Sequence, residues 1–484
     1  MRAEDSEGSR GASRQMAALS VGFIGPLPPT RSGIADYDAE ILAALTSLPS
    51  PSSRSRRSPL RFSSYEPSAA SAALDGGHDV LLFQVGNDPM HAPSVETLCA
   101  PGRRTPAVVV LHDFVLHHLF AAAYLDRGRE AEYARALEAA HGARGRALAD
   151  EGRRGPRLPV WDLDPWAFPM SAAVIRAADA VVAHSALVRG AVLRESPKTR
   201  TVEIPHHVVE APRTPRDEAR RALGLPLGRP VAATLGVVTP AKRIGKILEA
   251  LAALPPDGRP FLFVGGAVGD DDPLHRFVEE HDLGADVSFG GYLSDDDFWR
   301  AASAADFAVN LRHPTMGETS GAVCRLAGFG LPLVVSDTGW FRELPDAFAS
   351  KVPVGGDEVP RLAACISRLA FEPERTRARA EAAVRWGEER RPARVARAYE
   401  DVLREVADGT ARPRGLVGFV AHALVEVGVG RPGPLGGTSR ESDAALVAAV
   451  SSRVAPLLPP MSEERFSRKT KREEGPGVRR GLPG

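Results

Sequence analysis

The sequence predicts an α/β fold in which two parallel-sheet domains follow one another along the chain. Continuously apolar segments, such as residues 79–86 and 107–114, alternate with helical patterns. Strands of this kind are typical of parallel sheets that carry helices on both faces. The same alternation begins again at residue 231. We therefore expect twin Rossmann-like domains facing an inter-domain cleft, with ligands bound beyond the carboxyl ends of the strands.

The first domain is expected over residues 19–208. It follows a leader at 1–18, whose small and charged residues are typical of disorder. A Pro/Gly loop joins the first strand to a helix at 34–45, and helical patterns separate the later strands. The expected strands lie within residues 21–25, 79–86, 107–114, 178–185 and 201–208.

The second domain is expected over residues 209–408. It begins with a linker that contains one short helix and ends with Arg/Glu-rich amphipathic helices at 373–408. The expected strands lie within residues 231–243, 260–266, 286–292, 305–312 and 331–337. The Gly/Pro/Arg-rich tail at 409–484 is expected to be partly disordered. Its Ala/Val patches within 416–457 suggest docking on the first domain or light contact with a membrane.

The composition is that of an ordinary globular protein and excludes several classes. The 484 residues are 43% apolar and 25% charged, and 61 basic residues balance 61 acidic ones, so nothing indicates a nucleic-acid partner. No stretch approaches the roughly 20 uncharged apolar residues of a membrane-spanning helix. The first 18 residues lack the apolar run of a signal peptide.

The three cysteines, Cys99, Cys324 and Cys365, lie far apart in the sequence. Such spacing predicts neither a disulfide framework nor a metal cluster, and it suits a reducing compartment. We therefore expect a cytoplasmic protein, with peripheral contact at the inner face of a membrane left open.

A basic pair stands at the first strand-to-helix connection of the second domain. Only six of the 61 basic residues are lysines, so Lys242 in a loop is conspicuous. Lys242 and Arg243 precede an amphipathic helix, and two cations beside helix N–H groups suit a diphosphate. The alternative is a solvated pair of loop residues. Lys246, one turn further on, is expected at the surface.

A carboxylate, Glu318, precedes the small residues Thr319, Ser320 and Gly321 at another strand-to-helix connection. The amides of Ser320 and Gly321 could hold phosphate oxygens. Glu318 would then accept hydrogen bonds from neutral hydroxyl groups, of which a sugar offers several. This arrangement suits an anion joined to a polyol, such as a nucleotide sugar. The alternative is that Glu318 only complements the helix dipole.

In the first domain, His112 and Asp113 end the strand at 107–114, where residues that line a cleft are expected. His112 could hydrogen-bond a sugar hydroxyl or a leaving oxygen, and the alternative is a packing or capping role. The adjacent His117 and His118 begin a helix and cannot easily face one ligand. A metal site would need a third ligand, which is not evident.

Three further segments each allow a functional and a structural interpretation. Ser32 and Gly33, in the loop at 26–37, could bring backbone N–H groups to an anion or could form a plain rigid turn. The Asp-rich segments at 269–273 and 294–297 are expected to cap helices rather than bind a metal. The loop at 160–169 contains two tryptophans, which could form a sugar-stacking platform or cover the first domain.

Taken together, these segments resemble the retaining glycosyltransferases of family four, which have the GT-B fold. The resemblance runs from about residue 21 to residue 346 and is most specific in its last segment. The matching stretches are "GFIGPLPPTRSGIADYDAEIL", "VVVLHDFVLHH", "ADAVVAHSALVR", "IPHHV", "GVVTPAKRIGKILEAL", "GGYLSDDDFWRAASAADFAVNLR" and "PTMGETSGAVCRLAGFGLPLVVSDTGWFRELPD".

The resemblance implies an enzyme whose second domain binds a nucleotide-sugar donor and whose first domain binds the acceptor. Lys242 matches the family's phosphate-binding Lys, and Glu318 matches the first Glu of its paired-Glu signature. The implied catalytic residues are His112, Lys242 and Glu318. The implied donor-binding residues are Gly33, Arg243, Tyr292, Leu293, Thr319, Ser320 and Gly321, of which Tyr292 and Leu293 fall where the family lines the base pocket. Ser32 and Asp113 are the expected acceptor-binding residues.

Two positions depart from the family pattern. The second Glu of the signature, which grips the ribose, is replaced by Leu326, or by Arg325 when the segment is aligned backward from "GLP". Val237 stands where an Arg usually precedes the phosphate Lys, and Arg243 is the expected substitute. These departures affect the expected nucleotide and ribose contacts.

The sequence therefore predicts a metal-independent, retaining glycosyltransferase of glycan or glycoconjugate biosynthesis. The nucleotide sugar is a substrate, and no cofactor is expected. The acceptor could be a glycan, a lipid-linked glycan or a small molecule. The alternatives are a non-catalytic sugar-nucleotide-binding or assembly subunit, a phosphorylase or epimerase of the same fold, and a nucleotide-dependent oxidoreductase. The missing full G-x-G-x-x-G motif argues against the last of these.

Overall fold

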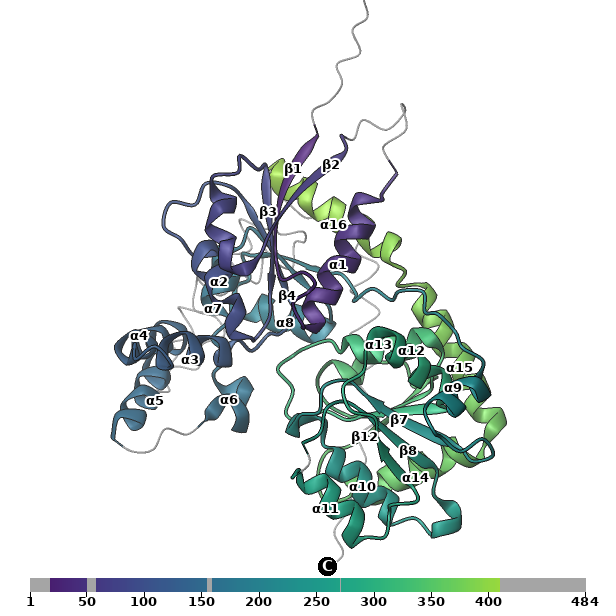
Figure 1. Cartoon of the computed structure of the whole chain (residues 1–484). Coiled ribbons are helices and arrows are strands. Elements are labelled where there is room, and N and C mark those ends of the chain that lie inside the picture. The colour runs from purple at the N-terminus through teal and green to yellow at the C-terminus, as the bar shows by residue number, and fades with distance from the viewer. Residues whose placement is uncertain (1–17, 50–57, 155–158, 270, 410–484) are drawn as a thin grey trace, which may run out of the picture. The chain divides into compact units, whose positions relative to one another are not determined.

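The computed structural model describes residues 18–49, 58–154, 159–269 and 271–409. The predictions for residues 1–17 of the leader at 1–18 and for the tail beyond residue 409, including the patches within 416–457, lie outside the described residues. Two six-stranded parallel sheets, each with helices on both faces, confirm the expected α/β architecture (Figure 1).

The first sheet has the strand order β2-β1-β3-β4-β5-β6, and all its pairings are parallel. The connections from β1 and β3 leave in opposite directions, so the switch point lies between these two strands. The strands are β1 (Leu19–Ile24), β2 (Leu60–Tyr65), β3 (Val80–Val85), β4 (Ala107–Leu111), β5 (Ala180–Ala183) and β6 (Arg200–Glu203).

The helices between these strands match the expected alternation. They are α1 (Gly33–Thr46), α2 (Ala92–Leu98), α3 (His117–Leu125), α4 (Glu130–His141), α5 (Ala143–Arg154), α6 (Val160–Leu163), α7 (Ala172–Ala177) and α8 (Ala186–Glu195). Ser32 is the N-cap of α1, and its hydroxyl accepts a hydrogen bond from the backbone N–H of Ile34 at 3.2 Å.

The second sheet has the order β12-β11-β10-β7-β8-β9, again entirely parallel. Its switch point lies between the neighbouring strands β7 and β10. The strands are β7 (Val231–Leu235), β8 (Phe261–Gly265), β9 (Val287–Phe289), β10 (Phe307–Asn310), β11 (Leu333–Ser336) and β12 (Ala349–Val352). The helices are α9 (Arg216–Ala222), α10 (Ile244–Ala252), α11 (Pro273–Glu280), α12 (Asp295–Ala304), α13 (Gly321–Phe329), α14 (Glu358–Phe371), α15 (Pro373–Glu388) and α16 (Pro392–Ala407).

The core of each half consists of two apolar layers, one on either face of its sheet. Along β4, Val108 and Val110 face one layer, while Val109 and Leu111 face the other. Because successive side chains of a strand point to opposite faces, a continuously apolar strand feeds both layers. This is the physical reason why the apolar segments of the sequence identify the central strands.

The sequence analysis missed the strands β2 and β12, which both lie at the edge of a sheet. The segment 60–65, "LRFSSY", alternates apolar and polar residues, and its side chains are half-buried or exposed. Strand β12 is only four residues long and contains Lys351. These two edge strands are covered less completely than the central strands, so they lack the continuous apolar run that identifies the central ones.

The last helix of the described chain packs on the first sheet rather than on the second. Val402 and Leu403 of α16 lie in one apolar layer with Phe23 of β1, and the Tyr399 and Tyr37 hydroxyls hydrogen-bond at 2.7 Å. Helix α16 therefore lies beside α1 (Figure 1), although the sequence groups it with residues 209–408. None of the described helices is both long and apolar enough to cross a membrane.

Candidate functional site

The loop after β7 turns Lys242 back toward the carboxyl end of that strand. Lys242 ends a short 3₁₀ turn, Pro240–Lys242, and its Nζ donates a hydrogen bond to the Leu235 carbonyl at 3.2 Å. A Cβ atom at Gly236 would lie 2.7 Å from this Nζ, so glycine makes room for the ammonium group. Burial, and then the nearby charge of Arg312, lower the pKa of Lys242 to about 7.

The side chain of Arg243 points away from Lys242 and toward α14. Its backbone adopts the left-handed conformation, with φ of 53°. Its guanidinium donates to both carboxylate oxygens of Glu358, a residue that is only 1% exposed. This bidentate ion pair satisfies the hydrogen-bonding groups of both side chains. Its charge is thus already paired with a buried carboxylate, and the predicted phosphate role of Arg243 stays a prediction.

The connection after β10 places Glu318 beside Arg312. Glu318 Oε1 lies 3.1 Å from Arg312 Nε. Its other oxygen, Oε2, accepts hydrogen bonds from the Thr315 hydroxyl at 2.8 Å and from the Met316 N–H at 2.7 Å. These contacts fix the carboxylate before the start of α13, where the sequence analysis expected it.

Helix α13 begins three residues after Glu318. Ser320 is the N-cap, and its hydroxyl accepts from the Val323 N–H at 3.4 Å. Gly321 is the first helical residue, and a Cβ atom there would lie 3.4 Å from Nε2 of His206. The buried Thr319 hydroxyl has no hydrogen-bond partner within the described chain. The first amides of this helix and the Thr319 hydroxyl are donors that an anion could use.

These residues meet at the switch point of the second sheet. The Lys242 loop follows β7, and the loop with Arg312 and Glu318 follows the neighbouring strand β10. Arg312 influences Lys242 electrostatically and forms an ion pair with Glu318. In open α/β sheets, ligands bind at this place.

In the first half, His112 follows β4, and its Nε2 lies 2.9 Å from Oε1 of the buried Gln84. If Gln84 accepts here, Nε2 carries the proton and Nδ1 is left as a hydrogen-bond acceptor. The sequence analysis did not single out Gln84, although it is the only polar residue in the strand "VLLFQV".

Three histidines at the carboxyl end of the first sheet lie close together. The rings of His112 and His184 are 5.3 Å apart, and those of His184 and His206 are 5.9 Å apart. Burial, together with the neighbouring histidines, holds the pKa of His112 and His206 well below the usual value, and burial lowers the pKa of His184 to about 4. These rings are therefore neutral at physiological pH, and no metal-binding group of three or more His, Cys, Asp or Glu occurs among the described residues.

Asp113 accepts a hydrogen bond from the Asn87 N–H at 2.8 Å. Burial, and then the charge of Glu318, raise the pKa of its carboxyl to about 7. The loop that follows it also contacts the Glu318 loop, because the N–H groups of Phe114 and Val115 both donate to the Met316 carbonyl, at 3.0 and 2.9 Å.

The remaining predicted residues lie at loop positions with different degrees of exposure. No atom would lie within 4 Å of a Cβ at Gly33, the first residue of α1. Tyr292 is 63% exposed, and the Arg31 guanidinium lies over its ring at 5.1 Å. Leu293 is half-buried and packs against the apolar layer of β8, so only part of it is open to a ligand.

The two candidates for the position of the second signature Glu, Leu326 and Arg325, have different surroundings. Leu326 is fully buried in the core, whereas Arg325 points toward α1. Arg325 donates to Glu40 at 2.6 Å and to Asp295 at 3.1 Å, and Glu40 also lies 2.6 Å from His207 Nε2. Neither residue offers a carboxylate at this place, and the Arg325 guanidinium is already paired with two acids.

The remaining features of the sequence have structural roles. Asp272 accepts from the Leu274 N–H at 2.9 Å, and Ser294 accepts from the Asp297 N–H at 3.2 Å, so both Asp-rich segments contain helix caps. Trp166 Nε1 donates to the Thr315 carbonyl at 2.8 Å, which ties the tryptophan loop to the segment that holds Glu318.

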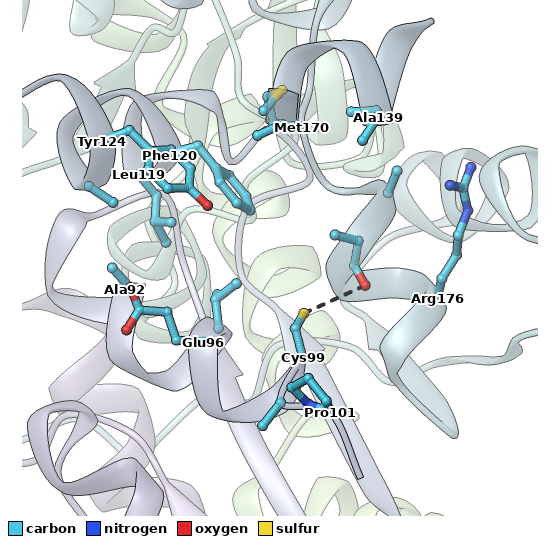
Figure 2. A pocket seen from close by; sticks show the side chains of 17 residues that line it. Ala92, Glu96, Cys99, Pro101, Leu119, Phe120, Tyr124, Ala139, Met170 and Arg176 are labelled. Carbon is cyan, nitrogen blue, oxygen red and sulfur yellow. Dashed lines mark hydrogen bonds between the residues drawn. The ribbon is translucent and has the colours of Figure 1, made fainter. Parts of the chain in front are cut away.

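A separate pocket lies in the first half (Figure 2). It is lined by helices α2, α3, α4 and α7, mainly with alanine, aliphatic and aromatic side chains. The charged residues of its lining are Glu96 and Arg176, and Arg176 pairs with Glu195 at 2.6 Å. None of the predicted site residues lines this pocket, and its apolar walls do not suit a diphosphate.

Solved structures of two other proteins are similar to this chain. HepE from Anabaena, solved in complex with UDP and glucose, aligns with a TM-score of 0.53 and 15% identity over 80% of this chain and 100% of that chain. Sucrose-phosphate synthase from Thermosynechococcus elongatus aligns with a TM-score of 0.53 and 16% identity, over 81% of this chain and 100% of that one. The chain has the GT-B fold.

Within this GT-B chain, residues 215–386 match the family model described as glycosyl transferases group 1. The matched segment contains the second sheet, with Lys242, Arg312 and Glu318. No protein of curated function matches the sequence.

Proposed function

We propose that the chain is a retaining glycosyltransferase that moves a sugar from a nucleotide-sugar donor to an acceptor hydroxyl. The observation that carries the proposal is the convergence of Lys242 and Glu318 on Arg312 at the switch point of the second sheet. This constellation lies within the segment that matches the glycosyl transferases group 1 model. A cation next to a carboxylate suits a ligand that joins an anion to a polyol.

Bond cleavage leaves negative charge on the departing diphosphate, and the second half would stabilise it. Lys242 supplies a positive charge in a buried setting, where each electrostatic contact counts for more than in water. The start of α13 adds backbone N–H donors. No metal is needed for this step, because the protein supplies the positive charge.

Glu318 would hold the donor sugar through its hydroxyl groups. Its carboxylate is held by three neighbours, so it is oriented in advance, and a carboxylate can accept further hydrogen bonds. A UDP-sugar is the first donor to test, since HepE has been solved in complex with UDP-glucose.

The first half would receive the acceptor. His112 is a neutral ring positioned by Gln84, and it can hydrogen-bond a hydroxyl group without attracting the diphosphate. Asp113 lies next to it, and its raised pKa keeps the carboxyl partly protonated at neutral pH. Ser32 and Gly33 lie at the start of α1, after β1 at the switch point of the first sheet. We propose an acceptor of the glycan class, lipid-linked or free, and a cytoplasmic location.

The second candidate function is a GT-B-like protein that binds a sugar nucleotide without turnover. The departure at Leu326 or Arg325 favours it, because neither residue is an acid and the charge of Arg325 is directed to Glu40 and Asp295. Ribose contacts would then have to come from other residues.

A thermal-shift screen across nucleotide sugars, followed by a turnover assay on the hits, separates these functions. Ligand at 100 times its Kd stabilises the folded state by about 2.7 kcal/mol, which raises the melting temperature. Stabilisation together with release of nucleoside diphosphate supports the transferase. Stabilisation without release or transfer supports the binding protein, and no stabilisation by any nucleotide sugar contradicts both.

A further inference from the structure

A second positively charged side chain that binds the diphosphate, next to Lys242, need not be Arg243. The family that the sequence resembles usually has an Arg ahead of the Lys, where this chain has Val237, and Arg243 is the substitute expected from the sequence. The structure separates these neighbours: Lys242 folds back to the end of β7, while Arg243 turns to the buried Glu358 on α14.

Removing Arg243 from Glu358 would be costly. Glu358 is 1% exposed, and the guanidinium contacts both of its oxygens. A buried carboxylate that loses its partner destabilises a protein by several kcal/mol. A ligand would therefore have to compete with this pair for the charge of Arg243.

The guanidinium of Arg312, unlike that of Arg243, still has hydrogen-bond donors available. The side chain of Arg312 is 18% exposed, and its Nε lies 3.1 Å from Glu318 Oε1. The Nε–H nevertheless does not point at this oxygen well enough to form a hydrogen bond. Within the described chain, the Arg312 guanidinium donates no hydrogen bond, whereas the backbone N–H of this residue donates to the Ser336 hydroxyl at 2.9 Å. Arg312 is thus placed by its backbone and by charge, with guanidinium donors still available.

The electrostatics of Lys242 agree with this geometry. After burial, the charge that lowers its pKa comes from Arg312, not from the adjacent Arg243. Two cations that repel each other in one buried region are stabilised together by a shared anion. The strands that hold them, β7 and β10, are the two strands of the switch point.

We propose that Arg312 is the second cationic ligand of the donor diphosphate, and that Glu318 holds its guanidinium ready for that contact. When the diphosphate takes over the guanidinium, Glu318 Oε1 becomes free to accept from a sugar hydroxyl. The two residues thereby couple recognition of the anion to recognition of the sugar. This inference rests on the proposed function, because it concerns the same donor site.

The test is the affinity for nucleoside diphosphates, measured by calorimetry with UDP, GDP and ADP and with the matching nucleosides. For the diphosphate that wild type binds, Arg312→Gln is expected to weaken affinity by about 10- to 100-fold, the usual effect of a lost charge-assisted hydrogen bond. Its effect on the nucleoside should be small. Arg385→Gln, which removes an exposed arginine paired with Glu381, controls for net charge. Arg312→Lys keeps a cation if Arg312→Gln folds poorly, and it should retain part of the affinity.

Glu318→Gln distinguishes this role from a merely structural ion pair. A structural pair predicts that Arg312→Gln and Glu318→Gln weaken diphosphate binding alike. The proposal predicts that Glu318→Gln binds the diphosphate at least as tightly as wild type, since a negative charge has left, but loses the extra affinity for the nucleotide sugar.

The possible failures are distinguishable. If wild type binds a diphosphate and Arg312→Gln binds it equally well, or if Arg243→Gln is the variant that loses affinity, the role of Arg312 is overturned while the proposed function stands. If wild type binds no nucleoside diphosphate and no nucleotide sugar, the proposed function is overturned, and this inference with it.

Discussion

The carboxyl ends of the two sheets carry different chemistry. The end of the first sheet is dominated by neutral hydrogen-bonding rings, His112, His184 and His206, whose pKa values burial holds low. The end of the second sheet carries the charged Arg312 and Glu318, together with Lys242, whose pKa of about 7 leaves it partly protonated at neutral pH. Both are built from loops that follow apolar strands, so the fold alone does not explain the difference.

The difference shows how one architecture can divide a reaction between two halves. A charged site can bind a diphosphate and stabilise it as it leaves. A neutral polar site can hold hydroxyl groups without competing for that anion. In our account, the second half binds the donor and the first half presents the acceptor.

The largest expected effect is the loss of Lys242. Lys242→Ala should lower kcat by about 10²- to 10³-fold, because it removes the charge that meets the leaving diphosphate. The melting temperature should stay the same or rise, since burying an ammonium group is unfavourable. Steady-state kinetics and a melting curve on the same preparation check both expectations.

Lys246→Ala is the matched control, because Lys246 pairs with Glu249 one turn along the chain and lies outside the site. Wild-type turnover in Lys242→Ala would contradict the charged role of the second half.

The neutral half is expected to contribute less. His112→Ala should reduce kcat/KM by about 10- to 100-fold, as expected for a lost hydrogen bond to a reacting group. Gln84→Leu should give a smaller loss, because it removes the partner that orients the ring but keeps the ring itself. An equally large loss in His118→Gln, an exposed neighbour on α3, would show that the effect is not specific to His112.

The lowered pKa of Lys242 also predicts that the protein takes up a proton when it binds a diphosphate. With a pKa of about 7, Lys242 is mostly neutral at pH 8, and a bound diphosphate favours its charged form. Diphosphate binding at pH 8 should therefore take up as much as about one proton. Calorimetry in two buffers with different ionisation enthalpies measures this number.

Lys242→Met should abolish the uptake, because methionine does not titrate. Uptake that persists in this variant would assign the proton to another group, with Asp113 as the first to examine, since its pKa is also about 7.

The smallest effect concerns the hydroxyl contact between Tyr399 of α16 and Tyr37 of α1, whose ring lies 4.9 Å from that of His112. Tyr399→Phe removes the hydroxyl that bonds Tyr37, and it should lower the free energy of unfolding by about 1 kcal/mol. The catalytic rate should change little, because the Tyr37 ring that packs on His112 is kept. Chemical denaturation checks the stability, and a large loss of activity at unchanged stability would show that α16 takes part in catalysis.

Much of the fold could be predicted because its central strands are buried on both faces. Their apolar runs appear directly in the sequence, as in Val80–Val85 and Ala107–Leu111. The edge strands β2 and β12 could not be found in this way, since partial exposure allows polar residues in them. The packing of α16 on the first sheet also needs the structure, because an amphipathic pattern does not name its partner.

The candidate site was predicted in part. Lys242 and Glu318 stand out because they lie at strand-to-helix connections. Arg312 was missed, although it comes two residues after an apolar strand and could have been noted for that reason. The pairing of Arg243 with Glu358 could not be foreseen, because 115 residues separate the two in the sequence.

The most direct measurement is a structure of the protein with a bound nucleoside diphosphate, beginning with UDP. We expect a phosphate oxygen within about 3 Å of Lys242 Nζ, at the switch point between β7 and β10. A diphosphate bound elsewhere, with Lys242 still directed only at the Leu235 carbonyl, would contradict this expectation.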